Sequence, residues 1–213
     1  MKIELKNITK KIKKNTVIDD INYTFTGGCI YGLAGKNGCG KTMLMRLIAG
    51  LIYPTEGKVY INDRMLGKDI SFPDSIGILI ENPEFLNDYT GYENLKMLAG
   101  LQKNVSDEDI KNTLESVGLD YNDKRKFYKY SLGMRQRLGI AAAIMGKPDI
   151  ILLDEPINAI DEEGVAQIKE LIRGLVEENR IIIIACHDKE EMDYLADKKL
   201  MMSAGKIVEE III

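Results

Sequence analysis

The stretch that decides the fold is CIYGLAGKNGCGKTMLMRLIA, residues 29–49. It opens with an apolar run typical of a buried strand, passes through a glycine-rich loop, and continues as a segment of helical composition that stops at Gly50. Residues 35–42 fit the pattern G-x-x-x-x-G-K-[ST], in the strand, loop and helix context that this pattern requires. The stretch therefore predicts a strand, a phosphate-binding loop and a helix in direct succession.

The groups of this loop have different expected tasks. Gly35, Gly38 and Gly40 let the backbone turn its N–H groups towards phosphate oxygens, and the helix N-terminus adds partial positive charge. We expect Lys41 to act on the β- and γ-phosphates and Thr42 to ligate Mg²⁺. The alternative, a flexible glycine turn that only caps a helix, is disfavoured by the agreement of the whole pattern with its context. The residues expected to bind the nucleotide here are Gly35, Lys36, Asn37, Gly38, Cys39, Gly40, Lys41, Thr42 and Met43.

A second informative stretch is IILLDEP, residues 150–156, in which an apolar run ends in two adjacent carboxylates. Such a run predicts a strand buried on both faces, and charge at its end needs a compensating partner such as a metal ion. Because ligands lie at the carboxyl ends of parallel strands, we expect Asp154 to hold Mg²⁺ and Glu155 to polarise an attacking water. The alternative is an acidic cap of a turn or helix, which Pro156 would suit.

His187, the only histidine, follows the apolar run IIIIAC and so is expected at the same edge as Asp154. A single histidine is more often structural than catalytic. At this edge, however, it could hydrogen-bond a γ-phosphate, which makes it a catalytic candidate.

The rest of the chain predicts an α/β fold with a mostly parallel sheet, because strand and helix patterns alternate on both sides of a helical middle. The first 35 residues, 57–63 and 75–81 have strand patterns, whereas about 92–146 is helical and includes a capping box at Ser106 and Asp109. After Pro148 we expect a strand, a helix near 162–178, a strand, a short helix near 189–196 and a terminal strand pair. We expect one domain, 1–213, with a core at about 1–83 and 147–213 and a helical insertion at about 84–146.

Composition limits the classes of partner. The net charge of −4 provides no field for nucleic acid, which is not an expected partner. Three widely spaced cysteines, without the spacing of a disulfide framework or zinc site, fit a reducing cytoplasm. The N-terminus reads as a strand rather than a signal peptide, and no apolar run reaches the roughly 20 residues of a membrane helix.

Five motifs, in this order and spacing, resemble those of the ATP-binding subunit of ABC transporters: GKNGCGKT, YSLGMRQR (130–137), IILLDEP, NAID (158–161) and CHD (186–188). The resemblance spans nearly the whole chain. It implies a P-loop NTPase fold with an N-terminal antiparallel β-subdomain and an inserted helical subdomain, and an ATPase with Lys41, Glu155 and His187 in catalysis. It also implies that Ser131 and Gly133 clasp ATP held by a second subunit, and that Asp161 lies in the loop crossing that dimer interface.

The chain departs from the family pattern at three places. Glu81 stands where glutamine is usual; it can also ligate Mg²⁺, and the substitution is similar to that of exporters handling bacitracin and lantibiotic-type peptides. The signature reads Ser-Leu-Gly-Met rather than Ser-Gly-Gly-Gln, which predicts a weaker clasp. Ile12 takes the place of the aromatic residue that stacks on adenine, which predicts modest nucleotide affinity.

The resemblance implies a subunit that uses ATP and Mg²⁺ to power transport through a separate membrane permease, with export of a peptide or drug as the hypothesis for its cargo. Its expected location is the cytoplasmic face of the cell membrane, and the segment NPEFLNDYTGYENL (82–95) is expected to contact the permease. Alternatives are a soluble ABC-type ATPase acting on ribosomes or DNA, and a nucleotide-gated binding module without turnover. The sequence leaves the substrate, its direction, and a homomeric or heteromeric dimer open.

Overall fold

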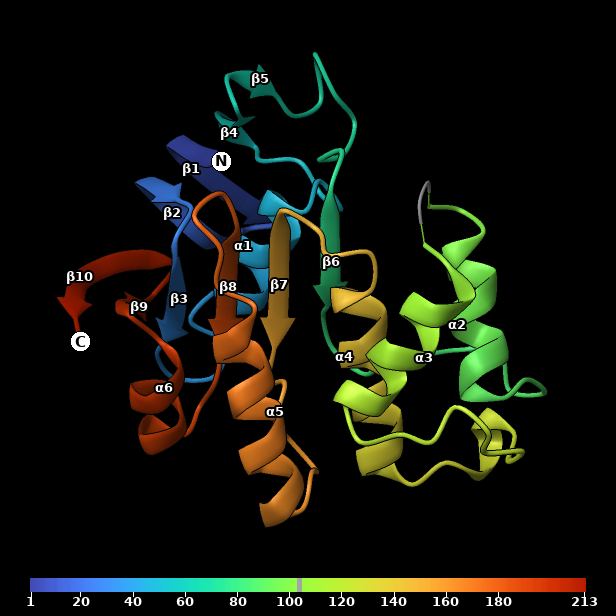
Figure 1. The fold of residues 1–213 in the computed structure, drawn as a ribbon. Coiled ribbons are helices and arrows are strands. Elements are labelled where there is room, and N and C mark those ends of the chain that lie inside the picture. The colour runs from blue at the N-terminus through green and yellow to red at the C-terminus, as the bar shows by residue number, and fades with distance from the viewer. Residues whose placement is uncertain (103–104) are drawn as a thin grey trace.

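Two β-sheets organise the chain in a computed structural model, which describes residues 1–102 and 105–213 (Figure 1). The larger sheet has the order β10-β9-β3-β8-β7-β6 and is parallel except where β10 pairs with β9. The smaller sheet, β2-β1-β4-β5, is antiparallel. The prediction of an α/β fold with a mostly parallel sheet and an N-terminal antiparallel part is confirmed.

The strands are β1 Lys2–Ile12, β2 Asn15–Thr26, β3 Cys29–Ala34, β4 Glu56–Ile61, β5 Arg64–Met65, β6 Ile76–Leu79, β7 Ile150–Asp154, β8 Ile181–Ala185, β9 Lys198–Ser203 and β10 Lys206–Ile212. The helices are α1 Lys41–Ile48, α2 Gly91–Ala99, α3 Asp107–Ser116, the 3-10 turn η1 Phe127–Lys129, α4 Leu132–Ile144, α5 Glu162–Gly174 and α6 Lys189–Leu195.

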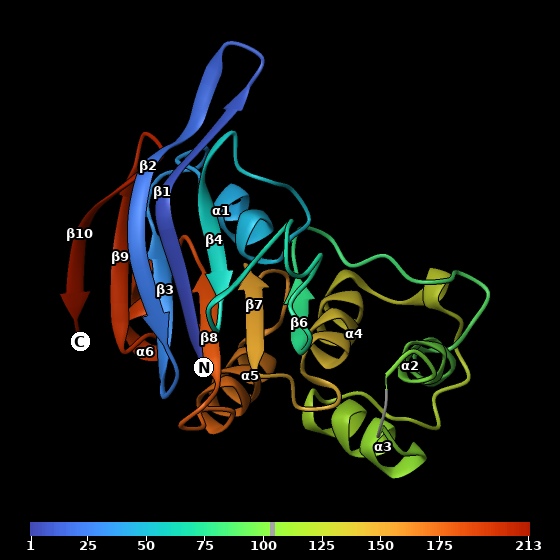
Figure 2. The same ribbon diagram turned by 90° about the horizontal axis from the view of Figure 1, so that it is seen from above.

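The larger sheet separates two apolar cores, which explains why its central strands are apolar at every position. All residues of β7 and β8 are buried. In β7, Ile151 and Leu153 pack in the core formed with α2–α6, whereas Ile150 and Leu152 pack with α1 and the antiparallel sheet. Figure 2 shows these two layers on opposite sides of β3, β8, β7 and β6. Two-sided burial is the expected property of strands with continuous apolar runs.

Between β6 and β7 the chain forms the helical middle, α2 to α4. Capping boxes at Thr90 with Glu93 and at Ser106 with Asp109 begin α2 and α3, and the second of these was predicted. The predicted helix at 162–178 is wrong at its end, because α5 stops at Gly174. The guanidinium of Arg180 donates to the carbonyl of Leu175 at 2.6 Å and satisfies this end of the helix in place of further turns.

The parallel strands carry their carboxyl ends to one edge, as the arrows of β3, β6 and β7 show (Figure 1). The phosphate loop follows β3, Glu81 follows β6, Glu155 follows β7 and His187 follows β8. The predicted site residues of these four segments therefore share one edge of the sheet. None of the helices in 1–102 and 105–213 is long and apolar enough to cross a membrane.

Candidate functional site

The loop between β3 and α1 is shaped by glycines packed against other backbone segments. Gly35 has φ 149°, and a Cβ there would lie 2.3 Å from the carbonyl oxygen of Met202. Gly40 has φ 114° and begins α1 with no side-chain cap, so no side chain competes for the first N–H groups of the helix. The N–H of Cys39 donates to the oxygen of Lys36 at 3.1 Å, and the Cys39 side chain is buried. The loop thus presents a helix N-terminus suited to an anion.

Lys41 and Thr42 lie beside a cavity of about 460 Å³ at this helix N-terminus. Lys41 is buried, and its Nζ donates to the oxygen of Gly35 at 2.8 Å. Thr42 Oγ1 donates to Asp154 Oδ2 at 2.6 Å, which ties the phosphate loop to the end of β7. The cavity is lined by Val17, Asn37, Gly38, Gly40, Lys41, Thr42, Met43, Asp154 and Glu155. The structure therefore gathers six of the nine nucleotide-binding residues predicted in this loop around one space.

Asp154 sits in an environment suited to a cation. Burial raises the pKa of its carboxyl and the hydrogen bond from Thr42 lowers it; among nearby charges, Glu155 and Glu81 raise the pKa and Lys41 lowers it. A bound cation would offset the unfavourable charge of the ionised form. No three His, Cys, Asp or Glu side chains in the described part of the chain can hold a metal by themselves. Hydroxyl and carboxylate oxygens fit Mg²⁺, which takes one or two protein oxygens and fills its other positions with water and phosphate.

Glu155 and His187 form a contact across the ends of β7 and β8. His187 Nδ1 lies 2.7 Å from Glu155 Oε2, and the His187 side chain is otherwise exposed. Glu155 has φ 50°, a left-handed conformation that is costly for a residue other than glycine. Gln136 of α4 donates to the carbonyls of Glu155 and Pro156 at 2.8 and 3.1 Å and fixes this turn. The arrangement holds a carboxylate at the cavity with an imidazole to orient it.

Glu81 is held by a partner that sequence reasoning did not identify. Its Oε1 lies 2.6 Å from Nη2 of Arg46, in the last turn of α1. The predicted role of Glu81 as a metal ligand stays a prediction, since its carboxylate is engaged with this arginine.

The signature residues and Asp161 meet at a separate hollow of about 510 Å³. Ser131 accepts from the N–H of Met134 at 3.2 Å and caps α4, while Asp161 caps α5 and pairs with Arg137 at 2.9 Å. A Cβ on Gly133 would lie 2.8 Å from the oxygen of Ala159, so this glycine permits close packing of the two segments. The hollow opens to solvent beside the exposed Leu132.

Ile12 lies apart from these groups, at the end of β1, where it pairs with Asn15 of β2. Its side chain is 42% exposed, and the hairpin of β1 and β2 projects beyond the rest of its sheet (Figure 2). Val17, farther along β2, is the aliphatic residue of this hairpin that lines the cavity. The predicted contact of Ile12 with a base stays a prediction.

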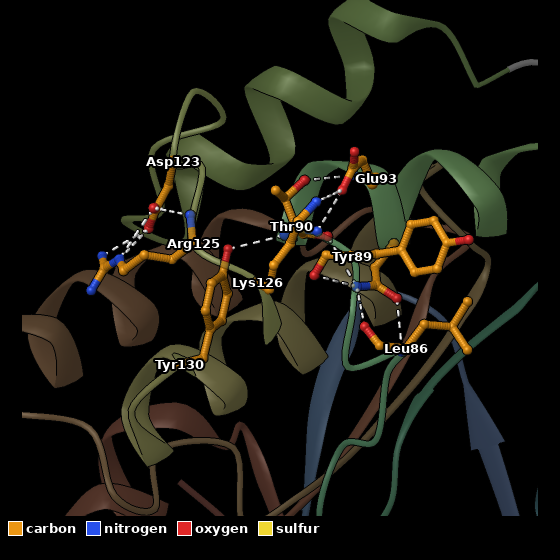
Figure 3. Close-up of polar contacts among 10 residues, drawn as sticks. Leu86, Tyr89, Thr90, Glu93, Asp123, Arg125, Lys126 and Tyr130 are labelled. Carbon is orange, nitrogen blue, oxygen red and sulfur yellow. Dashed lines mark hydrogen bonds and ion pairs between the residues drawn. The ribbon is translucent and has the colours of Figure 1, made fainter. Parts of the chain in front are cut away.

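The segment after Glu81 is bound to the residues before the signature motif (Figure 3). Phe127 N–H donates to the oxygen of Tyr89 at 2.8 Å, and the N–H of Gly91 donates to Oη of Tyr130 at 3.0 Å. Lys126 Nζ lies 3.0 Å from Oε2 of Glu93, the residue that closes the cap of α2. The start of α2 and the approach to Ser131 therefore form one connected unit.

Comparison with known proteins agrees with these motifs. Residues 18–158 match the family model described as ABC transporter. An uncharacterized ABC transporter ATP-binding protein of Bacillus subtilis, YybJ, is 51% identical over 96% of this chain and 94% of its own length. The bacitracin transport ATP-binding protein BcrA of Enterococcus faecalis is 42% identical over 98% of this chain and 68% of its own. The solved dimeric structure of MJ0796, a bacterial ABC transporter cassette, has a TM-score of 0.89 at 25% identity, covering 99% of this chain and 98% of that one.

The phosphate loop, the acids at the end of β7 and the two-sheet fold define an ATPase cassette of the P-loop class. The chain belongs to the ABC transporter family, as an ATP-binding subunit.

Three residues at the site escaped sequence reasoning: Arg46, Gln136 and Val17. Gln136 carried a partial signal through its place in the motif YSLGMRQR, but its burial in α4 is visible only in the structure. Arg46 and Val17 carried none, since an arginine late in a helix and a valine in a strand are ordinary residues there.

Proposed function

We propose that the chain binds Mg-ATP in the cavity at the N-terminus of α1 and couples hydrolysis to export of a peptide or drug through a separate membrane permease. The observation that carries this proposal is the Glu155–His187 contact beside the Thr42–Asp154 bond. It brings a candidate base and two oxygen ligands to one cavity, and it places beside that base an imidazole that can orient it. Its test is the Glu155→Gln variant, which should lose ATP turnover and retain ATP affinity.

The residues divide the work as follows. The N–H groups at the start of α1 and the Lys41 ammonium hold the β- and γ-phosphates. Thr42 and Asp154 hold Mg²⁺, which when bound offsets the charge of the phosphates. Glu155 orients a water and accepts its proton, and His187 steers the Glu155 carboxylate towards that water and can donate to a γ-phosphate oxygen.

A second ATP-binding subunit completes the site in this proposal. The hollow with Ser131, Gly133 and Asp161 is open to solvent and offers the N-terminus of α4, which suits a nucleotide held by the other subunit. The dimeric structure of the MJ0796 cassette supports this arrangement. It requires one ATP to be contacted by Lys41 of one subunit and Ser131 of the other.

The permease would contact the helical middle and the segment after Glu81. Leu86 and Tyr89 are 53% and 43% exposed. The same segment contributes its first residues, 82–85, to a groove of about 460 Å³ between α1, β6 and α4. We propose that residues 84–146 move as a subdomain against a core formed by 1–83 and 147–213, because β6 and β7 are joined through it. Such a contact would hold the subunit at the cytoplasmic face of the membrane.

The proposed cargo class rests on two observations. BcrA of Enterococcus faecalis is named for bacitracin transport, and SrtF of Streptococcus pyogenes, 34% identical over 98% of this chain and 90% of its own, is named for lantibiotic transport. This chain also has Glu81 at the position where its motif resembles such exporters.

Gentle solubilisation of native membranes and capture of the tagged chain test the permease step. A multi-span membrane protein recovered in stoichiometric amount is the expected result, and cells lacking the pair should become more sensitive to bacitracin or lantibiotics. Recovery with ribosomes or DNA-bound proteins instead would contradict the proposal. In cells that lack this chain but keep the permease, a Glu155→Gln chain should restore the complex without restoring resistance.

A further inference from the structure

Three acidic residues follow the strand ends at the phosphate edge, and the carboxylate of each has a different partner. Asp154 accepts from the Thr42 hydroxyl, Glu155 contacts His187, and Glu81 pairs with Arg46. The Arg46–Glu81 pair is the one that includes a permanently charged cation. Its two residues come from different elements, since Arg46 belongs to α1 and Glu81 follows β6.

The charge of Glu81 already acts on the site. Because Leu79 of β6 pairs with Leu153 of the parallel neighbour β7, Glu81 and Glu155 follow this pair by the same number of residues and lie at the same edge of the sheet. A nucleotide would bring further negative charge to the same edge, so an unpaired Glu81 would oppose its binding. The guanidinium of Arg46 offsets this charge at a distance of 2.6 Å.

The pair also fixes where the Glu81 carboxylate points. Glu81 has φ 63°, a left-handed conformation that directs the chain sharply away from the strand direction of β6. The Glu81 side chain is 62% exposed and would be free to turn if Arg46 did not hold it. Arg46 has less freedom than Glu81, because its side chain is only 31% exposed.

We propose that Arg46 is a positioning residue for Glu81: it holds the carboxylate on α1, away from the phosphates, and so allows an acid to occupy this place beside the phosphate loop. The inference rests on the proposed binding of ATP in the cavity next to Lys41. In this inference the two ends of α1 have different tasks. Lys41, at its start, contacts the phosphates, and Arg46, in its last turn, fixes Glu81 at the beginning of the segment that leads to α2.

The test is a double-mutant cycle on ATP affinity, measured by calorimetry in EDTA, with Arg46→Gln, Glu81→Gln and the double variant. With Glu81 present, Arg46→Gln should weaken ATP binding about three- to fivefold, the upper range for one partly exposed pair. In the Glu81→Gln background, the same change should have an effect of less than about 1.5-fold, because no carboxylate is released. Arg46→Lys should restore most of the affinity as a point charge, without the planar fork of arginine.

A second measurement separates positioning from damage to the fold. The carboxylate released by Arg46→Gln becomes an additional oxygen ligand for Mg²⁺. The half-restoring Mg²⁺ concentration, at which half of the ATP affinity gained with Mg²⁺ is reached, should therefore decrease, whereas the ATP affinity in EDTA should weaken. A loss of structure would worsen both quantities. Arg64→Gln, which removes a paired arginine from the antiparallel sheet, is the matched control and should change neither.

Equal losses from Arg46→Gln in the unmodified chain and in the Glu81→Gln background would overturn the inference, because Arg46 would then act on the nucleotide directly. An increase in the half-restoring Mg²⁺ concentration would also overturn it. Failure of the unmodified chain to bind ATP at all would instead contradict the proposed function.

Discussion

His187 Nδ1 lies 2.7 Å from Oε2 of Glu155, although the two residues are 32 positions apart in the chain. They meet because β7 and β8 are parallel neighbours in register, with Asp154 beside Ala185, so that the residues following each strand are brought together. Glu155 then has a nitrogen partner on one side and the cavity on the other. This geometry assigns the two residues linked tasks, which substitutions can separate.

Glu155→Gln should reduce ATP turnover by about 10²- to 10⁴-fold, because the amide cannot accept a proton from water. ATP affinity should be retained, since the substitution removes a negative charge and keeps the side-chain length. Steady-state phosphate release and calorimetric ATP binding measure the two quantities. Retained turnover would show that the base has been assigned wrongly.

His187→Ala should lower turnover with little change in ATP affinity, because it removes the group that orients Glu155. If the two residues act as a unit, adding His187→Ala to Glu155→Gln should cause almost no further loss. Turnover of the single and double variants forms the cycle. Independent, multiplicative losses would contradict a joint role.

Asp154→Asn should stabilise the chain free of nucleotide and metal at pH 7, while abolishing Mg²⁺-dependent turnover. The folded pKa of Asp154 is raised, chiefly by burial, so its ionisation is less favourable in the folded state than in the unfolded state. The unfolding free energy of the unmodified chain should therefore fall as pH rises through this pKa. Thermal melts at several pH values measure the gain in unfolding free energy caused by Asp154→Asn. This gain should disappear as the pH is lowered towards about 4, the ordinary pKa of aspartate. A gain that persists at low pH would point to packing rather than charge.

Ile12→Tyr should tighten ATP binding about fivefold, the equivalent of about 1 kcal/mol of stacking. The position is exposed at a hairpin end and can accept a ring without disturbing the core. Inorganic tripolyphosphate, which has no base, is the control ligand, and its affinity should not change. Unchanged ATP affinity would remove Ile12 from the nucleotide site.

Gly133→Ala should lower the unfolding free energy by about 1–3 kcal/mol and reduce turnover, because the new Cβ would lie 2.8 Å from the oxygen of Ala159. ATP binding to the phosphate loop of the single subunit should persist. Gly174→Ala is the matched control: a Cβ there meets nothing within 4 Å, and the change should be neutral or stabilising by up to about 1 kcal/mol. Equal behaviour of the two variants would contradict the packing role of Gly133.

Much of the fold followed from local patterns in the sequence. The phosphate loop could be predicted because a strand, a glycine turn and a helix are consecutive in the chain, and β7 because its apolar run admits only two-sided burial. The shared edge of Asp154 and His187 followed from the rule that parallel strands end together. The end of α5 did not follow, because the capping group of Arg180 comes from beyond the helix itself.

The candidate site was predictable in its members but only partly in its contacts. Nothing local pairs Arg46 with Glu81 or aims Gln136 at the carbonyl of Glu155, since each contact depends on how α1 and α4 pack against the sheet. The left-handed conformations of Glu81 and Glu155 were also hidden, because neither residue is a glycine. Tertiary packing decides such features, and single-sequence patterns do not record it.

The complete burial of β7 and β8 has a consequence for the order in which the molecule opens. Amide hydrogens in strands with neighbours on both sides and apolar cores on both faces exchange with solvent only when the whole domain unfolds. Asp154 ends β7 and His187 follows β8, so both stay attached to the slowest-exchanging part of the chain. Ser131 lies outside these strands, between η1 and α4, so a local opening of the turn at η1 does not require the strands that carry the chemistry to separate.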